Sequence, residues 1–236
     1  MEKRESLKKE PLIPEKDFAP APSGIGAKLS GLYNKSFGVL KLILGICLLP
    51  FVYSSVVSFL NELSLVEKPL QGLFWWGSVS FLGVYLFVWE PAVIYTRGHK
   101  LLELIFNFFK PLVRVAPYLL PIYTIVLFLL YGLFSLFTKS GWLIEYTVFL
   151  SGFSLILHLV FSAKTLRTKK QDFLKANYIF GFSFIFILNL ALLSFCLSTI
   201  FKRFSFVDFV NTSFAIARDL FVALFDQLFR NKPMAV

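Results

Sequence analysis

Histidine, cysteine and charged residues are all scarce in this chain. Its 236 residues include two histidines, two cysteines and only 16% Asp, Glu, Lys and Arg, whereas 57% are hydrophobic and 30 are phenylalanine. Cys47 and Cys196 lie far apart, each inside an apolar segment, which excludes a disulfide framework and a Cys-x-x-Cys metal site. With a mean hydropathy of +0.72, the composition also excludes a soluble domain and predicts a polytopic membrane protein.

The few charges collect between the apolar segments and sum to +10. They lie in short loops and a terminal tail, without the basic and aromatic surface that nucleic-acid recognition uses. We therefore interpret them as signals of membrane orientation and expect no nucleic-acid partner.

Five apolar segments are each close to the roughly 20 residues that a helix needs to cross about 30 Å of hydrocarbon. Because lipid offers no partner to backbone N–H and C=O groups, these segments should be helices. The predicted fold class is all-α, a polytopic membrane helical bundle of about five transmembrane helices plus a C-terminal amphipathic helix. A further short amphipathic helix is expected at about 98–110. The predicted spans lie at about 39–60, 73–96, 117–137, 142–162 and 177–200.

The chain divides into three regions. Residues 1–30 mix Lys and Glu and contain four prolines, which predicts a disordered or partner-bound tail. Residues 31–204 form the membrane domain, and residues 205–236 an interfacial amphipathic helix that lies in the membrane surface or in a partner's groove. Ser205, three residues before Asp208, is a capping-box-like start for this helix. Its polar face comprises Asp208, Thr212, Asp219, Asp226 and Arg230.

The numbers of Lys and Arg residues alternate between the two sides of the predicted bundle. The segment up to Lys41 has eight, and the loops 97–116 and 163–176 have four and five, whereas 61–71 and 138–141 have one each. By the positive-inside rule this alternation predicts a cytoplasmic N-terminus. Five spans then place the basic residues of the C-terminal region outside, which conflicts with the rule.

Four polar residues are candidates for a metal site. His99 and Glu103 are four residues apart and share a helix face, His158 lies near the same membrane depth, and Asp172 follows in the next loop. Imidazole and carboxylate groups are zinc ligands, and three of them with an open fourth position form the catalytic arrangement. Each residue also has an ordinary interpretation as a hydrogen-bonded or ion-paired polar group near the headgroups. Zinc binding by these four residues is therefore a hypothesis, and we do not predict a bound cofactor.

Several motifs in this order resemble a group of uncharacterised bacterial membrane proteins related to site-2-protease-like zinc metallopeptidases. The resemblance implies a multi-pass protein of the bacterial inner membrane whose first zinc ligand corresponds to His99. The similar stretches are KLILGICLLPF at 41–51, GHKLLE at 98–103, APYLLPIY at 116–123, LILHLVFS at 155–162 and TLRTKKQD at 165–172.

The chain departs from that group inside the motif that binds zinc. An H-E-x-x-H helix supplies two histidine ligands and a glutamate base, but here Lys100 replaces the base and Glu103 replaces the second histidine. A charged lysine cannot accept a proton from water. We therefore expect a non-catalytic binding or scaffold subunit, a pseudoprotease, held in the lipid bilayer and contacting other membrane proteins through its N-terminal tail and C-terminal helix.

Three other functions stay open. A divergent intramembrane zinc protease would use His99, Glu103 and either His158 or Asp172 as ligands and take its base from elsewhere. A transporter or channel needs polar groups near the bilayer midplane, where only Asn189 qualifies, and we expect Asn189 to be hydrogen-bonded inward as structural support. A cofactor-binding membrane subunit could use the two histidines to ligate a metal.

Overall fold

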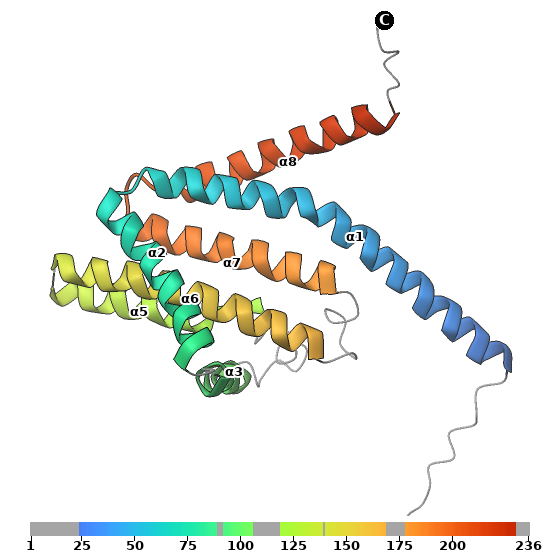
Figure 1. Ribbon diagram of the computed structural model, residues 1–236, viewed down its shortest axis with the longest axis horizontal. Helices are drawn as coiled ribbons and strands as arrows, with labels where there is room; N and C mark the ends of the chain where they lie inside the picture. Colours follow the sequence, from blue (N-terminus) through green and yellow to red (C-terminus); the bar gives the residue numbers. More distant parts are fainter. Residues whose placement is uncertain (1–23, 89–91, 106–118, 139, 169–177, 230–236) are drawn as a thin grey trace, which may run out of the picture. The chain divides into compact units, whose positions relative to one another are not determined.

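The computed structural model describes residues 24–88, 92–105, 119–138, 140–168 and 178–229. These residues form seven α-helices and one π-helical turn and contain no strand, which confirms the all-α fold class (Figure 1). Two compact units comprise residues 1–37 and 38–236, and the described part of the first is the beginning of α1. The elements are α1 (Gly24–Ser64), α2 (Lys68–Gly83), η1 (Val84–Val88), α3 (Ala92–Ile105), α5 (Ile122–Phe137), α6 (Gly141–Thr168), α7 (Tyr178–Ile200) and α8 (Phe206–Phe229).

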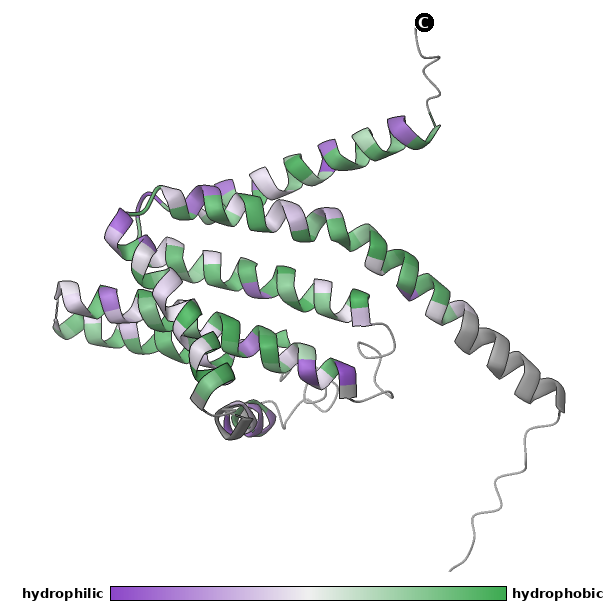
Figure 2. Ribbon diagram, in the orientation of Figure 1, coloured by the Kyte–Doolittle hydropathy of each residue, from purple (hydrophilic) through white to green (hydrophobic). Residues whose placement is uncertain are grey.

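Four helices are long and apolar enough to cross a membrane. The fifth predicted span contains α5, whose 16 residues reach about 24 Å at 1.5 Å per residue. Hydrophobic residues cover most of the visible length of these helices (Figure 2), as is typical of helices in contact with lipid. The membrane bundle is therefore confirmed as four long spans and one shorter apolar helix. The four candidate spans are Ser36–Ser64, Lys68–Phe87, Gly141–Arg167 and Tyr178–Ile200.

The second span ends sooner than hydropathy predicts. The predicted boundaries were about 73–96, but α2 starts at Lys68, passes into the π-helical turn η1, and a separate helix α3 starts at Ala92. The expected amphipathic helix at 98–110 therefore begins earlier. Proline is favoured at the start of a helix, where its missing N–H costs no hydrogen bond, so Pro91 in the sequence suits the start of α3 at Ala92.

The first helix also begins before its apolar segment. Helix α1 starts at Gly24, so residues 24–30 of the predicted tail are helical, while residues 1–23 lie outside the described ones. The sequence has no proline between Pro22 and Pro50, so nothing in this stretch interrupts the backbone hydrogen bonds that continue the helix.

The largest buried cluster lies where α1 and α7 end and α8 begins. Its aromatic centre is Phe59, whose ring lies 5.6 Å from that of Phe74 in α2 and 6.0 Å from that of Phe204 before α8. This cluster joins five helices, α1, α2, α6, α7 and α8. Its other buried members are Leu63, Val66, Val148, Leu155, Leu159, Leu190, Leu193, Leu197 and Phe209.

Helices α2 and α6 cross with their backbones in contact. A Cβ atom on Gly77 of α2 would overlap the Phe149 carbonyl of α6, and one on Gly152 of α6 would overlap the Phe74 carbonyl of α2. Membrane helices pack in this way because small residues allow the close approach that dispersion requires. Gly83 in α2 and Gly132 in α5, by contrast, have no neighbouring atom within 4 Å of an added Cβ.

Asn189 is fully buried in α7, as predicted. Its side-chain amide donates to the carbonyl oxygens of Ile185 at 2.7 Å and of Leu119 at 3.2 Å. The second bond ties α7 to the segment that leads into α5. Asn189 therefore supports helix packing, which confirms the expected inward hydrogen bonding.

Candidate functional site

The candidate site is built on α3, which packs against α5 and α6. Tyr95, His99 and Glu103 are spaced by four residues and therefore follow one face of this helix. Gly98 sits at the contact with α5, because a Cβ there would lie 2.8 Å from side-chain atoms of Ile122 and Tyr123. The glycine that precedes His99 thus lets α3 approach α5 closely and positions the helix that carries the candidate ligands.

His99 and Glu103 lie close enough to interact. His99 Nε2 is 3.5 Å from Glu103 Oε1, an ion pair when the imidazole is protonated. The His99 side chain is 19% exposed and that of Glu103 is 48% exposed, so the pair lies at the edge of the packed bundle. The two residues therefore share one face of α3, as their spacing predicts.

His158 reaches the same region from α6. It is buried, with only 4% of its surface exposed, and its ring lies 6.1 Å from the ring of Tyr95. The ring of His99 lies 6.0 Å from the same tyrosine, and Tyr95 also stacks on Phe161 at 5.1 Å. The structure therefore gathers both histidines of the chain around one aromatic side chain.

These contacts bear on the metal-site hypothesis. His99, Glu103 and His158 come from helices that pack together, whereas Asp172 lies outside the described residues, so its part in the prediction stays untested. Within the described ranges, no three His, Cys, Asp or Glu side chains are arranged to hold a metal ion. Because the described residues do not supply the three ligands that a zinc site requires, we derive no step through zinc.

Tyr95 is the residue of this region that sequence reasoning missed. The sequence predicts it only as an aromatic anchor at the membrane surface. Its spacing of four residues from His99 was the available signal, but no pattern in the sequence shows that α6 would bring His158 to the same ring.

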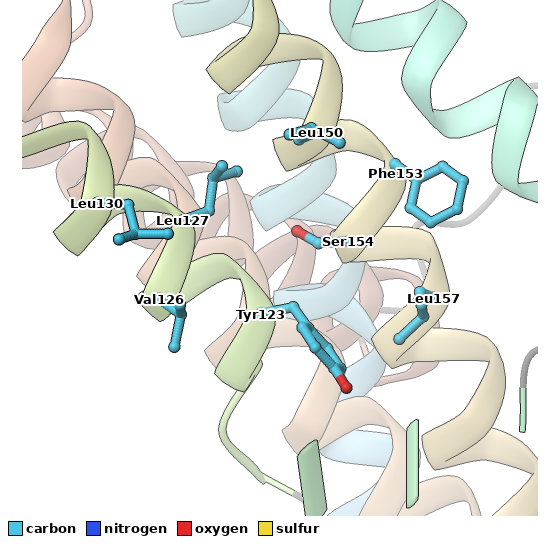
Figure 3. A pocket seen from close by; sticks show the side chains of 8 residues that line it. All are labelled: Tyr123, Val126, Leu127, Leu130, Leu150, Phe153, Ser154 and Leu157. Carbon is cyan, nitrogen blue, oxygen red and sulfur yellow. The ribbon is translucent and has the colours of Figure 1, made fainter. Parts of the chain in front are cut away.

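A separate cavity of about 280 Å³ lies between α5 and α6. Figure 3 shows Tyr123 at its α5 side and Leu157 and Ser154 along α6. Ser154 Oγ is hydrogen-bonded to Thr124 Oγ1 at 2.8 Å, so its hydroxyl is satisfied. The remaining lining is apolar, which matches the hydrocarbon surroundings of these helices and assigns no reaction to the cavity. The lining residues are Tyr123, Val126, Leu127, Leu130, Leu150, Phe153, Ser154 and Leu157.

No protein-family model, curated protein or solved structure matches this chain.

Proposed function

We propose that the chain is a non-catalytic subunit of a membrane assembly. It would be a pseudoprotease, because its motifs resemble those of metallopeptidases but Lys100 stands where they have the glutamate base. The observation that carries this proposal is the outer face of α8. Phe209, Ser213 and Ala217 are the buried residues of this helix, and the opposite side exposes apolar and charged side chains together. A surface that mixes these side chains suits neither water nor lipid alone, which favours contact with another protein.

The chemistry of α3 supports the same proposal. Lys100 occupies the position that the resemblance assigns to the catalytic glutamate, and its side chain is exposed. His99 and Glu103 interact with each other, and His158 is packed against Tyr95. These residues have structural contacts that require neither a metal nor a substrate.

A photo-crosslinking amino acid at Phe214 tests the binding role. Phe214 is 64% exposed on α8, and Leu133, 52% exposed on α5, is the matched control. We expect protein adducts from position 214 in native membranes and lipid adducts alone from position 133. His99→Ala should leave the adducts from position 214 unchanged. Lipid adducts alone at both positions would contradict the proposal.

A divergent intramembrane zinc protease is the second candidate, favoured by the gathering of both histidines around Tyr95. Elemental analysis of the purified protein separates the two functions. The scaffold proposal expects the same metal content in wild type and in His99→Ala. Near-stoichiometric zinc that is lost in the variant, together with zinc-dependent proteolysis abolished by the same change, would replace the first proposal with the second.

A further inference from the structure

The start of α8 is fixed at the end of α1. Glu62 Oε2 accepts a hydrogen bond from the Ser205 backbone N–H at 2.8 Å, and Ser205 Oγ accepts one from the Asp208 N–H at 3.1 Å. The predicted cap by Ser205 is thus confirmed, but Glu62 of α1 accepts the N–H that a capping box gives to a residue of its own helix. Helix α8 therefore begins at the level in the membrane where α1 ends.

From this point α8 runs back along α1. The rings of Phe51 and Phe221 lie 5.8 Å apart. Phe51 is 13 residues before the end of α1, and Phe221 is 15 residues after the start of α8, which gives about 20 and 22 Å at 1.5 Å per residue. These nearly equal lengths describe two helices that run in opposite directions from a shared end, and Figure 1 shows them separating toward the C-terminal end of α8. Because α1 is a candidate span, α8 follows it back into the membrane.

The face of α8 that turns inward is suited to this packing. Phe209, Ser213 and Ala217 are buried at a spacing of four residues, and Phe221 continues the same series. Two of these side chains are small, which allows close approach to α7 and α1. The first half of the helix, as far as Ala217, is therefore packed on the membrane bundle, and Phe221 adds one ring contact with α1.

The distance between the charged residues near the two ends of α8 matches the thickness of a membrane. Asp208 and Asp226 are 18 residues apart, about 27 Å along the helix and close to the roughly 30 Å of hydrocarbon. Between them the sequence has only two charged residues, Arg218 and Asp219. Arg218 donates to Asp219 Oδ1 from Nε at 3.0 Å and from Nη2 at 2.9 Å, so the charge inside the membrane is balanced.

The crossing also removes the conflict in the positive-inside rule. With α8 as a further crossing, Arg230 and Lys232 follow its end on the side of the strongly basic N-terminal segment. Helix α8 is not among the candidate spans, and its contacts with α7 and the ring contact of Phe221 with Phe51 of α1 hold it beside the bundle.

The two charged residues in the middle of α8 are exposed, and lipid cannot solvate them. Arg218 and Asp219 are 66% and 68% exposed, at about 18 to 20 Å from the start of the helix. Exposed charges at that depth are costly in lipid. In a two-fold dimer whose axis follows the membrane normal, Arg218 of each copy meets Asp219 of the other at the same depth, since an isologous contact is reciprocal.

We infer that α8 crosses the membrane antiparallel to α1 and pairs, through Arg218 and Asp219, with α8 of a second copy of the chain. This inference rests on the binding role proposed above and names the partner of that surface.

Single-cysteine labelling tests the crossing. Cys47 and Cys196 are first replaced by alanine, and a cysteine is then introduced at Lys202, before α8, or at Phe229, at its end. Ser140, directly before α6, and Arg167, in its last turn, are the reference positions for the two sides of the membrane. A membrane-impermeant maleimide should label Lys202→Cys from the same side as Ser140→Cys, and Phe229→Cys from the side of Arg167→Cys. Labelling of both α8 positions from one side would overturn the crossing and place the helix in the interface.

Charge exchange between two differently tagged copies tests the pairing. Arg218→Asp makes the contact wholly acidic, and Asp219→Arg makes it wholly basic, so each variant alone should lose copurification of its two tags. Coexpression of one copy of each variant should restore copurification, a result that a bond within one helix cannot produce. Arg203→Asp is the matched control, because it changes the charge equally before α8 and should leave pairing intact.

The outcomes also separate this inference from the proposed function. Failure of the mixed variants to pair, while Arg203→Asp pairs normally, overturns the second copy as partner. Adducts from position 214 to a different protein would then preserve the binding role. Lipid adducts alone at position 214, with no pairing of the tagged copies, would reject both the binding role and the dimer.

Discussion

The crossing of α2 and α6 makes Gly77→Ala the most informative single substitution for stability. An added Cβ would overlap the Phe149 carbonyl group and lie 2.8 Å from its carbon. Carbon atoms in contact are about 3.5 Å apart at closest, so the helices must separate by at least about 0.7 Å (3.5 minus 2.8). A gap of that size removes a quarter to a half of the dispersion energy of each atom pair at the crossing.

We expect Gly77→Ala to lower the free energy of unfolding by about 3 kcal/mol, the upper end of the usual range for overpacking. The obstacle is backbone, which cannot rotate away as a side chain can. Gly152→Ala should cost less, because its added Cβ lies 3.1 Å from the Phe74 carbonyl carbon. The double variant should cost less than the sum of the two, since one separation of the helices relieves part of both overlaps.

Gly83→Ala is the control for this experiment. It lies at the end of the same helix α2, and an added Cβ there has no atom within 4 Å. Alanine favours helix by about 1 kcal/mol over glycine, so this variant should be neutral or slightly more stable. Reversible unfolding in mixed detergent micelles, followed by the fluorescence of Trp75 and Trp76 in α2, measures all four proteins. Equal stability of Gly77→Ala and Gly83→Ala would refute the packing argument.

Three further substitutions address hydrogen bonds inside the bundle. Glu62→Ala removes the acceptor of the Ser205 N–H and should cost about 1.5–3 kcal/mol, with faster amide exchange at the start of α8, whereas Glu62→Gln keeps an acceptor and should cost less. Asn189→Leu removes both bonds that its amide donates and should lower stability by about 1 kcal/mol in the same unfolding assay; unchanged stability would mean that these bonds contribute nothing. Thr124→Val breaks the 2.8 Å bond to Ser154 and should cost about 0.6 kcal/mol, and a cost several times larger would indicate that α5 also repacks.

Hydropathy predicts much of this fold because lipid offers no hydrogen-bond partners to the backbone. A backbone in hydrocarbon must satisfy its own hydrogen bonds, so apolar runs become helices of predictable length. The last span was predicted at about 177–200 and is Tyr178–Ile200, and the C-terminal helix was predicted within 205–236 and is Phe206–Phe229 in the described residues. The predicted second span, about 73–96, extends too far because hydropathy alone does not register that α3 starts at Ala92.

Contacts between distant segments could not be predicted in the same way. Glu62 and Ser205 are 143 residues apart, and neither belongs to a periodic pattern that would relate them. Gly77 and Gly152 were identified as small residues, yet only the observed crossing separates them from Gly83, which has no neighbour. At the candidate site, the spacing of His99 and Glu103 predicted their contact, but the position of His158 beside Tyr95 depends on how α3 lies against α6.

The two candidate surfaces of the chain rest on different parts of its core. Phe59 centres the cluster where α8 begins, whereas Tyr95 packs on a second cluster formed by Phe81, Leu157 and Phe161, and the two clusters share no residue. Substitutions in clusters without common partners are expected to act additively. A change at His99 should therefore leave the pairing of α8 intact, and Glu62→Ala should weaken that pairing without altering the packing of Tyr95. The proposed binding role requires this independence, because changes around Tyr95 would then leave the contacts of α8 in place.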